Sequence, residues 1–164
     1  MADIYSEQQL QSSQECIDSC SEMRRGGALE DALRHNLSSF LRLMFTNNPK
    51  WVELHIRGSE AQVEFSRNQN EHRGFVDSLV GATAIEYEGN LQNTAKFRTG
   101  YKQVEEYCAG LLNLGYPPAN IRGILSDTVQ WYAYNVEILT LDKSSNFSAE
   151  DLELIEIESV NCEV

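Results

Sequence analysis

The sequence lacks any stretch that would carry it into or across a membrane. It has no run of about 18 apolar residues, the length that a membrane-spanning helix requires. Residues 1–7 contain neither a basic region nor an apolar core, so they do not form a secretory signal. A cytoplasmic location is therefore the default expectation.

Cysteine and histidine are few and scattered. Cys16 and Cys20 have the i,i+4 spacing of one helix face, but no further ligands stand near them to complete a zinc site. We expect small, buried or half-buried thiols in a reducing compartment. His35, His55 and His72 are not placed to suggest a Ser-His-Asp or Cys-His nucleophile.

Positive charge is scarce as well. The 13 Lys and Arg residues face 25 Asp and Glu residues, which gives a net charge of −12. Phosphate contacts supply most of the affinity for nucleic acid, so this charge argues against a stand-alone nucleic-acid binder. It does not exclude an enzyme that touches nucleic acid locally, because residues 24–122 hold twelve of the thirteen bases. Residues 150–163 hold six acids and no base.

What remains is an ordinary globular composition, 41% hydrophobic, over a one-domain length of 164 residues. Helical periodicity is strongest at 28–45, where apolar residues recur at 29, 33, 37, 40, 41 and 44. A second helix is predicted from 97 or 99 to 114, capped by Gly115 and stopped by the prolines at 117 and 118. A looser helix is expected within 1–23, and a short one from Ser148.

Period-two alternation and β-branched runs predict six strands, at 51–56, 61–65, 74–80, 83–88, 121–126 and 129–141. The first two are expected to form a hairpin, and a tight turn at Gly81 joins the next two. This order favours an α/β or α+β fold with a central mixed sheet flanked by helices. We divide the chain into an N-terminal helical extension (1–27), a core (28–142) and an acidic segment (143–164) that could lead into further domains.

Three carboxylates stand in otherwise apolar strands. Asp77 lies in the strand at 74–80, and Glu86 and Glu88 share one face of the strand at 83–88. Pairing through the Gly81 turn would bring Asp77 and Glu86 together, and close carboxylates raise each other's pKa or recruit a cation. Mg²⁺ favours such oxygen ligands, so a site for phosphodiester hydrolysis is chemically sensible. The alternative is that these acids form the wet face of an edge strand.

The order of these features resembles the PD-(D/E)xK nuclease superfamily, whose members share a restriction endonuclease-like αβββαβ core. More narrowly, it resembles the nuclease domain at the N-terminus of large restriction–modification enzymes. The resemblance covers about residues 28–136. It rests on three motifs: Gly74-Phe-Val-Asp77, then Ile85-Glu86-Tyr87-Glu88, then a helix with Gln103 and Tyr107.

The resemblance implies a DNA endonuclease and assigns roles to its residues. Asp77 and Glu86 would ligate Mg²⁺ or Mn²⁺, helped by the main-chain carbonyl of Tyr87. Glu30 would hold a second ion or a metal-bound water, and Gln103 would orient a side chain or touch the nucleic-acid backbone.

Simpler roles are open for some of these residues. Glu30 could be a solvated acid paired with Arg34 at i,i+4. Gln103 and Tyr107 could be ordinary surface and core residues of their helix. Trp131, Tyr132 and Tyr134 fit sheet packing better than a base-stacking platform.

One departure from the family pattern concerns the chemistry itself. The family has a lysine where this chain has Glu88, and that lysine stabilises charge on the attacking and transferring groups. Glutamate reverses the sign and should repel phosphate. Three explanations are open: a binding-only descendant, replacement of the lysine by Lys96 or Lys102, or an inactivating substitution. The leading hypothesis is a Mg²⁺-dependent DNA endonuclease domain silenced at Glu88, and the alternative is a non-catalytic module whose acidic surface faces a basic partner.

Overall fold

The computed structural model describes residues 7–44, 59–67, 70–140 and 142–162. Two helices come first, α1 (Glu7–Arg25) and α2 (Glu30–Met44). The predicted apolar stripe of α2 is confirmed, since Leu33 and Leu37 on it are almost completely buried. Acids open this helix and Arg42 lies in its last turn, which is the arrangement that the helix dipole favours.

A six-stranded sheet follows, with its strands side by side in the order of the sequence. The first three are β1 (Ser59–Arg67), β2 (Asn70–Val80) and β3 (Thr83–Tyr87), and neighbours in this group are antiparallel. The last three, also antiparallel to one another, are β4 (Arg122–Ser126), β5 (Gln130–Ile138) and β6 (Leu152–Asn161). Among the strands that the structure describes, only β3 and β4 pair in parallel, so the chain must cross over between these two strands.

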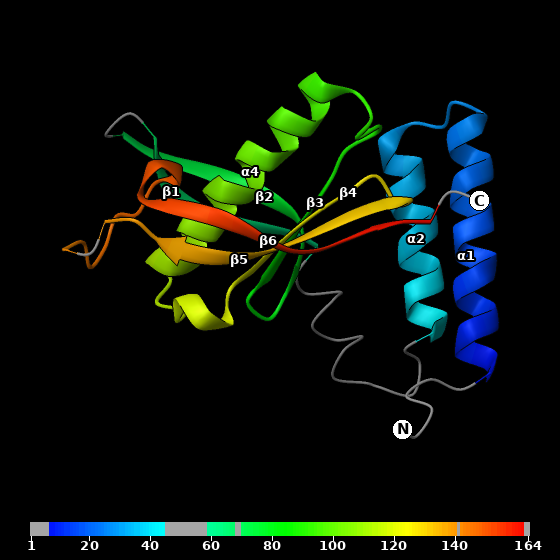
Figure 1. The fold of residues 1–164 in the computed structure, drawn as a ribbon, viewed down its shortest axis with the longest axis horizontal. Coiled ribbons are helices and arrows are strands. Elements are labelled where there is room, and N and C mark those ends of the chain that lie inside the picture. Colours follow the sequence, from blue (N-terminus) through cyan, green and yellow to red (C-terminus); the bar gives the residue numbers. More distant parts are fainter. Residues whose placement is uncertain (1–6, 45–58, 68–69, 141, 163–164) are drawn as a thin grey trace.

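Helix α4 (Thr94–Asn113) makes that crossover and packs against the sheet (Figure 1). It begins at Asn93, whose side chain accepts hydrogen bonds from two backbone N–H groups of the first turn. It ends at Leu114, and Gly115 follows with a positive φ of 85°, the predicted glycine cap. Buried side chains such as Val104 and Leu111 join it to the main hydrophobic core.

Helices α1 and α2 lie side by side, away from α4 (Figure 1). They share a smaller hydrophobic cluster with the sheet, to which Cys16 and Cys20 contribute from α1 and Tyr87 from β3. Cys16, Cys20 and Cys108 are buried free thiols, as we expected.

The architecture is therefore α/β: two N-terminal helices and a six-stranded mixed sheet with one helix packed against it. The predicted strand at 51–56 lies outside the described residues. The predicted helix at Ser148 is a short 3₁₀ turn, η2 (Ala149–Asp151), and a second one, η1 (Pro118–Asn120), precedes β4. The sequence prediction missed β6 entirely. Among the described residues no helix is both long and apolar enough to span a membrane.

Candidate active site at the end of β3

Glu86 and Glu88 mark the C-terminal end of β3, and both are buried, at 5% and 8% exposure. The backbone N–H of Glu88 continues the pairing with β4 by donating to the Ser126 carbonyl at 2.8 Å. Ile85 and Tyr87, which alternate with the two acids, pack in the cluster under α1 and α2. The wet edge-strand alternative is therefore wrong, because β3 lies between β2 and β4 and its acids are buried.

Asp77 reaches the same region from β2. It directly precedes the cross-strand pair Ser78–Ile85, so it lies beside the end of β3. One carboxylate oxygen, Oδ2, accepts a hydrogen bond from the Tyr87 backbone N–H at 2.9 Å. The other, Oδ1, accepts from the Arg34 guanidinium of α2. Asp77 thus joins β2 to both β3 and α2.

Lys96 brings a second cation to these acids from the first turn of α4. Its Nζ atom lies 3.1 Å from Oε2 of Glu88 and 3.9 Å from Oε2 of Glu30 on α2. A cation near a helix N-terminus is disfavoured by the helix dipole, so the carboxylates must offset that cost. Of the two lysines considered as replacements, Lys96 lies at the acids, whereas Lys102 lines a pocket farther along α4.

Four carboxylates, hereafter the acidic cluster, influence one another here: Glu30, Asp77, Glu86 and Glu88. Burial raises the pKa of Glu86 to about 9, and the charges of the other three members add to the rise. Burial and the charge of Glu88 likewise raise the pKa of Glu30, against the effect of Lys96. Oε2 of Glu86 is buried without a hydrogen-bond partner. A cation at this place would relieve both the repulsion and the missing partner.

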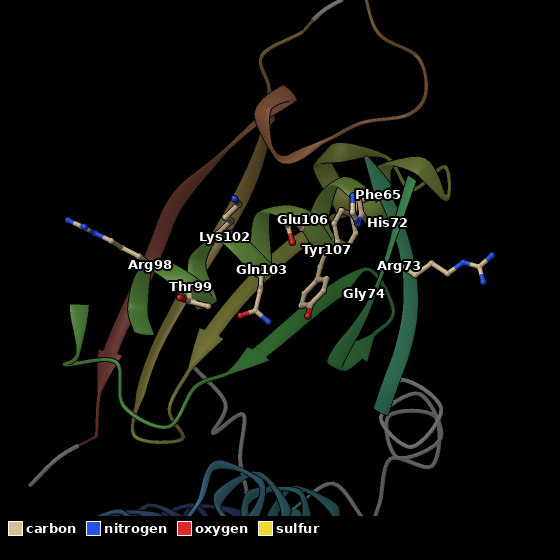
Figure 2. A pocket seen from close by; sticks show the side chains of 10 residues that line it. All are labelled: Phe65, His72, Arg73, Gly74, Arg98, Thr99, Lys102, Gln103, Glu106 and Tyr107. Carbon is tan, nitrogen blue, oxygen red and sulfur yellow. The ribbon is translucent and has the colours of Figure 1, made fainter. Parts of the chain in front are cut away.

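Gln103 and Tyr107 project in the same direction from α4 (Figure 2). The Tyr107 hydroxyl donates to the Phe75 carbonyl at 3.0 Å. Burial and the nearby charge of Glu86 raise the pKa of Tyr107, while a hydrogen bond with Gln103 opposes that rise. A hydrogen bond with Tyr107 also opposes the rise in the pKa of Glu86. Tyr107 is therefore held by β2 through Phe75, and the charge of Glu86 in the acidic cluster acts on it.

A glycine lets α4 approach the cluster closely. A Cβ atom on Gly100 would lie 2.9 Å from Cγ of Glu88 and 2.6 Å from Cδ1 of Leu125. Glycine inside a helix costs about 1 kcal/mol relative to alanine. At Gly100 the absence of a side chain lets α4 pack tightly against the buried Glu88, at that cost in helix stability.

The loop after β3 is held by Asp127, a buried carboxylate that, unlike Glu86, has several hydrogen-bond donors. Asp127, which is fully buried, accepts hydrogen bonds from the backbone N–H groups of Leu91, Val129 and Gln130. Arg24 of α1 forms an ion pair with it at 3.2 Å. The Leu91 contact holds the segment between β3 and α4, and the Val129 and Gln130 contacts hold the turn between β4 and β5.

Sequence reasoning missed two parts of the site. It treated Arg34 only as a partner of Glu30, although Arg34 pairs with Asp77 and with Asp31. It also missed a pocket of about 610 Å³ between the β1–β2 hairpin and α4, which Lys102 and Gln103 help to line (Figure 2). The pair with Asp31 follows the i,i+3 spacing of a helix, but the pair with Asp77 could not be read from spacing, since 43 residues separate the two.

The acids are not arranged as a finished metal site. Across the described parts of the chain, no group of three or more His, Cys, Asp or Glu side chains has a geometry that could hold a metal ion. Arg34 and Lys96 instead neutralise two of the four acids, Asp77 and Glu88. An external cation would have to displace Arg34 to reach Asp77, or Lys96 to reach Glu88.

Comparisons of the chain with models of protein families, with curated proteins and with solved structures gave no significant match.

Proposed function

We propose that this chain is a nuclease domain of the PD-(D/E)xK type from a restriction–modification system, with DNA as its substrate and the acidic cluster as its centre. The order of elements supports this proposal. Helix α2 precedes the antiparallel strands β1 to β3, and α4 then crosses to β4, parallel to β3. That order is the one expected from the αβββαβ core that the resemblance to the PD-(D/E)xK superfamily implies.

The observation that carries the proposal is the buried Glu86 carboxyl, which has an unpartnered oxygen and three acidic neighbours. Asp77 and Glu86 would hold Mg²⁺ or Mn²⁺, with Glu30 and the Tyr87 carbonyl as further oxygen donors. Such an ion supplies Lewis-acid activation of water and of the phosphodiester. The Tyr87 N–H positions Asp77, and Arg34 must release Asp77 for the ion to bind.

Glu88 is the residue that silences this centre in our proposal. Its negative charge replaces the lysine that the motif expects, and a negative charge repels a phosphodiester. Lys96, 3.1 Å away, offsets that charge but is half-exposed and is engaged by Glu88 itself. We therefore propose that Lys96 does not replace the missing lysine while Glu88 holds it.

The Glu88→Lys variant tests the proposal by plasmid nicking in the presence of Mg²⁺ or Mn²⁺. We expect cleavage by this variant above that of the unmodified chain, and loss of the cleavage on addition of EDTA. The double variant Glu88→Lys/Asp77→Ala should be inactive. Glu88→Gln is the matched control, because it removes the negative charge without adding a positive one. A Glu88→Lys protein that is folded by circular dichroism and cleaves nothing would refute the proposal.

A non-catalytic module on the same scaffold is the second candidate, and one observation favours it. Arg34 and Lys96 already neutralise two acids of the cluster, so the fold can be stable without a metal ion. In that case Arg34 and Lys96 take the place of the ion permanently. Calorimetry separates the candidates: Mn²⁺ binding that disappears in Asp77→Ala supports the nuclease, and no binding to the unmodified chain supports the module.

A further inference from the structure

The pocket between the β1–β2 hairpin and α4 differs in charge from the rest of the chain. Three permanent cations line it, namely Arg73, Arg98 and Lys102, and His72 adds a fourth basic group. Glu106 is the one acid among its ten lining residues. In a chain of net charge −12 this is a local basic site, and local positive charge attracts an anion even to an acidic protein.

The three permanent cations of the pocket come from two elements, Arg98 and Lys102 from α4 and Arg73 from β2. Figure 2 shows Arg98 extending from one end and Arg73 from the other, with Gln103 and Tyr107 between them. Arg98 and Lys102 are exposed on α4, while Arg73 shares its charge with Glu64 at 3.0 Å in an exposed pair. Exposed pairs contribute little, so Arg73 can exchange that partner for a phosphate.

The middle of the pocket is aromatic and polar. The rings of Phe65 and His72 are stacked, with centroids 6.3 Å apart and an angle of 18° between their planes. Tyr107, Gln103 and the buried Glu106 complete this part of the lining. Phe65 and Tyr107 are buried, so the half-buried His72 is the ring on which a nucleobase can stack, and the half-buried Gln103 amide can hydrogen-bond a base edge.

The pocket is also connected to the acidic cluster. Tyr107 and Gln103 line it, and the Tyr107 hydroxyl donates to the carbonyl of Phe75, which precedes Asp77 by two residues on β2. A strand lying in the pocket therefore passes next to the acids. The volume of about 610 Å³ is within the range of small-molecule pockets, roughly 300–1,000 Å³, and is too small for a duplex.

We propose that this pocket binds one unpaired nucleotide of a nucleic-acid strand. The base lies in the aromatic and polar middle, and the flanking phosphates lie at Arg98 and Lys102 on one side and at Arg73 on the other. This inference deepens the proposed function: it rests on the acidic cluster being a nuclease centre, and it makes single-stranded or locally opened nucleic acid the preferred substrate.

Fluorescence anisotropy in EDTA tests the pocket without any cleavage. The probes are a labelled single-stranded 12-mer oligodeoxynucleotide and the duplex of the same sequence. The single strand should bind at least about tenfold more tightly, because base stacking adds about 1–3 kcal/mol per base and a duplex cannot offer it. His72→Ala should weaken single-strand binding and leave duplex binding almost unchanged.

Charge variants locate the binding site. Arg98→Ala and Lys102→Ala should each weaken binding, and each should reduce the slope of log K against log salt by about 0.7, the value for one phosphate contact on a single strand. Arg25→Ala is the matched control, because it removes the same charge from an exposed position on α1.

Three results would contradict nucleotide binding in the pocket. They are equal affinity for single strand and duplex, equal losses of affinity in Arg25→Ala and Lys102→Ala, or no binding to either probe. Failure of the nuclease proposal looks different. In that case Glu88→Lys cleaves nothing with Mg²⁺, yet the same protein binds the single strand in EDTA.

Discussion

Two buried carboxylates near each other in the fold have opposite surroundings. Asp127, at the β4–β5 turn, is fully buried and has three backbone donors and an arginine as partners. Glu86, at the end of β3, is 5% exposed, has an unpartnered oxygen and lies among other acids. A buried charge is stable only when it is paired, so Asp127 has the surroundings of a structural residue, whereas the Glu86 carboxylate lacks the partners that its charge requires.

The largest expected effect comes from breaking the satisfied carboxylate. Asp127→Ala removes the carboxylate that pairs with Arg24 and accepts from three backbone N–H groups, and removing one member of a buried pair costs about 3–5 kcal/mol. We expect that loss in the free energy of unfolding, measured by urea denaturation. Asp18→Ala, on the exposed surface of α1, should change it by less than about 0.5 kcal/mol. If Asp127→Ala lowered the free energy of unfolding only slightly, Asp127 would not be the structural carboxylate that we contrast with Glu86.

Glu86→Gln should instead raise the free energy of unfolding. The pKa of Glu86 is raised from 4.5 in the unfolded chain to about 9 in the folded one, so ionisation favours unfolding between these values. Stability of the unmodified chain should therefore fall as the pH rises from about 5 to 9, whereas Glu86→Gln removes that loss. In EDTA at pH 8 the gain should be on the order of 2–4 kcal/mol. Below pH 4.5 it should vanish.

A pH-independent difference between Glu86→Gln and the unmodified chain would contradict this account, because only the ionisation of Glu86 produces the slope. Thermal unfolding across the pH series, with the same buffers for both proteins, gives the measurement.

The Arg34→Met variant tests whether an internal cation occupies the place of an external ion at the acidic cluster. Arg34 holds Oδ1 of Asp77, so it competes with any external ion for that oxygen. We expect Arg34→Met to raise the affinity for Mn²⁺ by about tenfold, which corresponds to about 1.4 kcal/mol. Arg25→Met should leave the affinity unchanged. Weaker Mn²⁺ binding in folded Arg34→Met would mean that Arg34 supports the site and does not compete with the ion.

A third carboxylate, Asp151 of η2, should give the smallest effect. Burial alone would raise its pKa, but hydrogen bonds from Lys143, Ser148 and Thr140 lower it to about 2. Asp151 therefore contributes stability above pH 3.8, and that contribution is lost as the pH falls through 2. Asp151→Asn should cost about 1 kcal/mol at pH 7, the size of a capping interaction, and almost nothing at pH 2. An equal cost at both pH values would exclude ionisation as the cause.

Local patterns predicted most of the fold. The apolar stripe around Leu33 and Leu37 indicated α2, and Gly115 marked the end of α4, because such signals depend only on neighbours in the sequence. Strand β6 was missed although Leu152 and Leu154 alternate with Glu153. Its many acids led us to read residues 143–164 as an acidic segment. The strand becomes evident only from its long-range pairing with β5.

The candidate site also has parts that local patterns predicted and parts that only the three-dimensional structure reveals. Asp77, Glu86 and Glu88 were found because acids within apolar strands are unusual in the sequence alone. The ion pair between Arg34 and Asp77 depends on the packing of α2 against the end of β3, which no spacing rule encodes. The basic pocket likewise joins β2 to α4, so its residues come together only in three dimensions.

The most direct test of the central claim is calorimetric titration of Mn²⁺ into the unmodified chain and into Glu86→Gln at pH 7.5, in two buffers of different ionisation enthalpy. Because Glu86 with a pKa of about 9 carries a proton at this pH, binding should release close to one proton per ion. Glu86→Gln should bind Mn²⁺ far more weakly and release no proton. No binding to the unmodified chain, or equal binding to both proteins, would contradict a cation site at the end of β3.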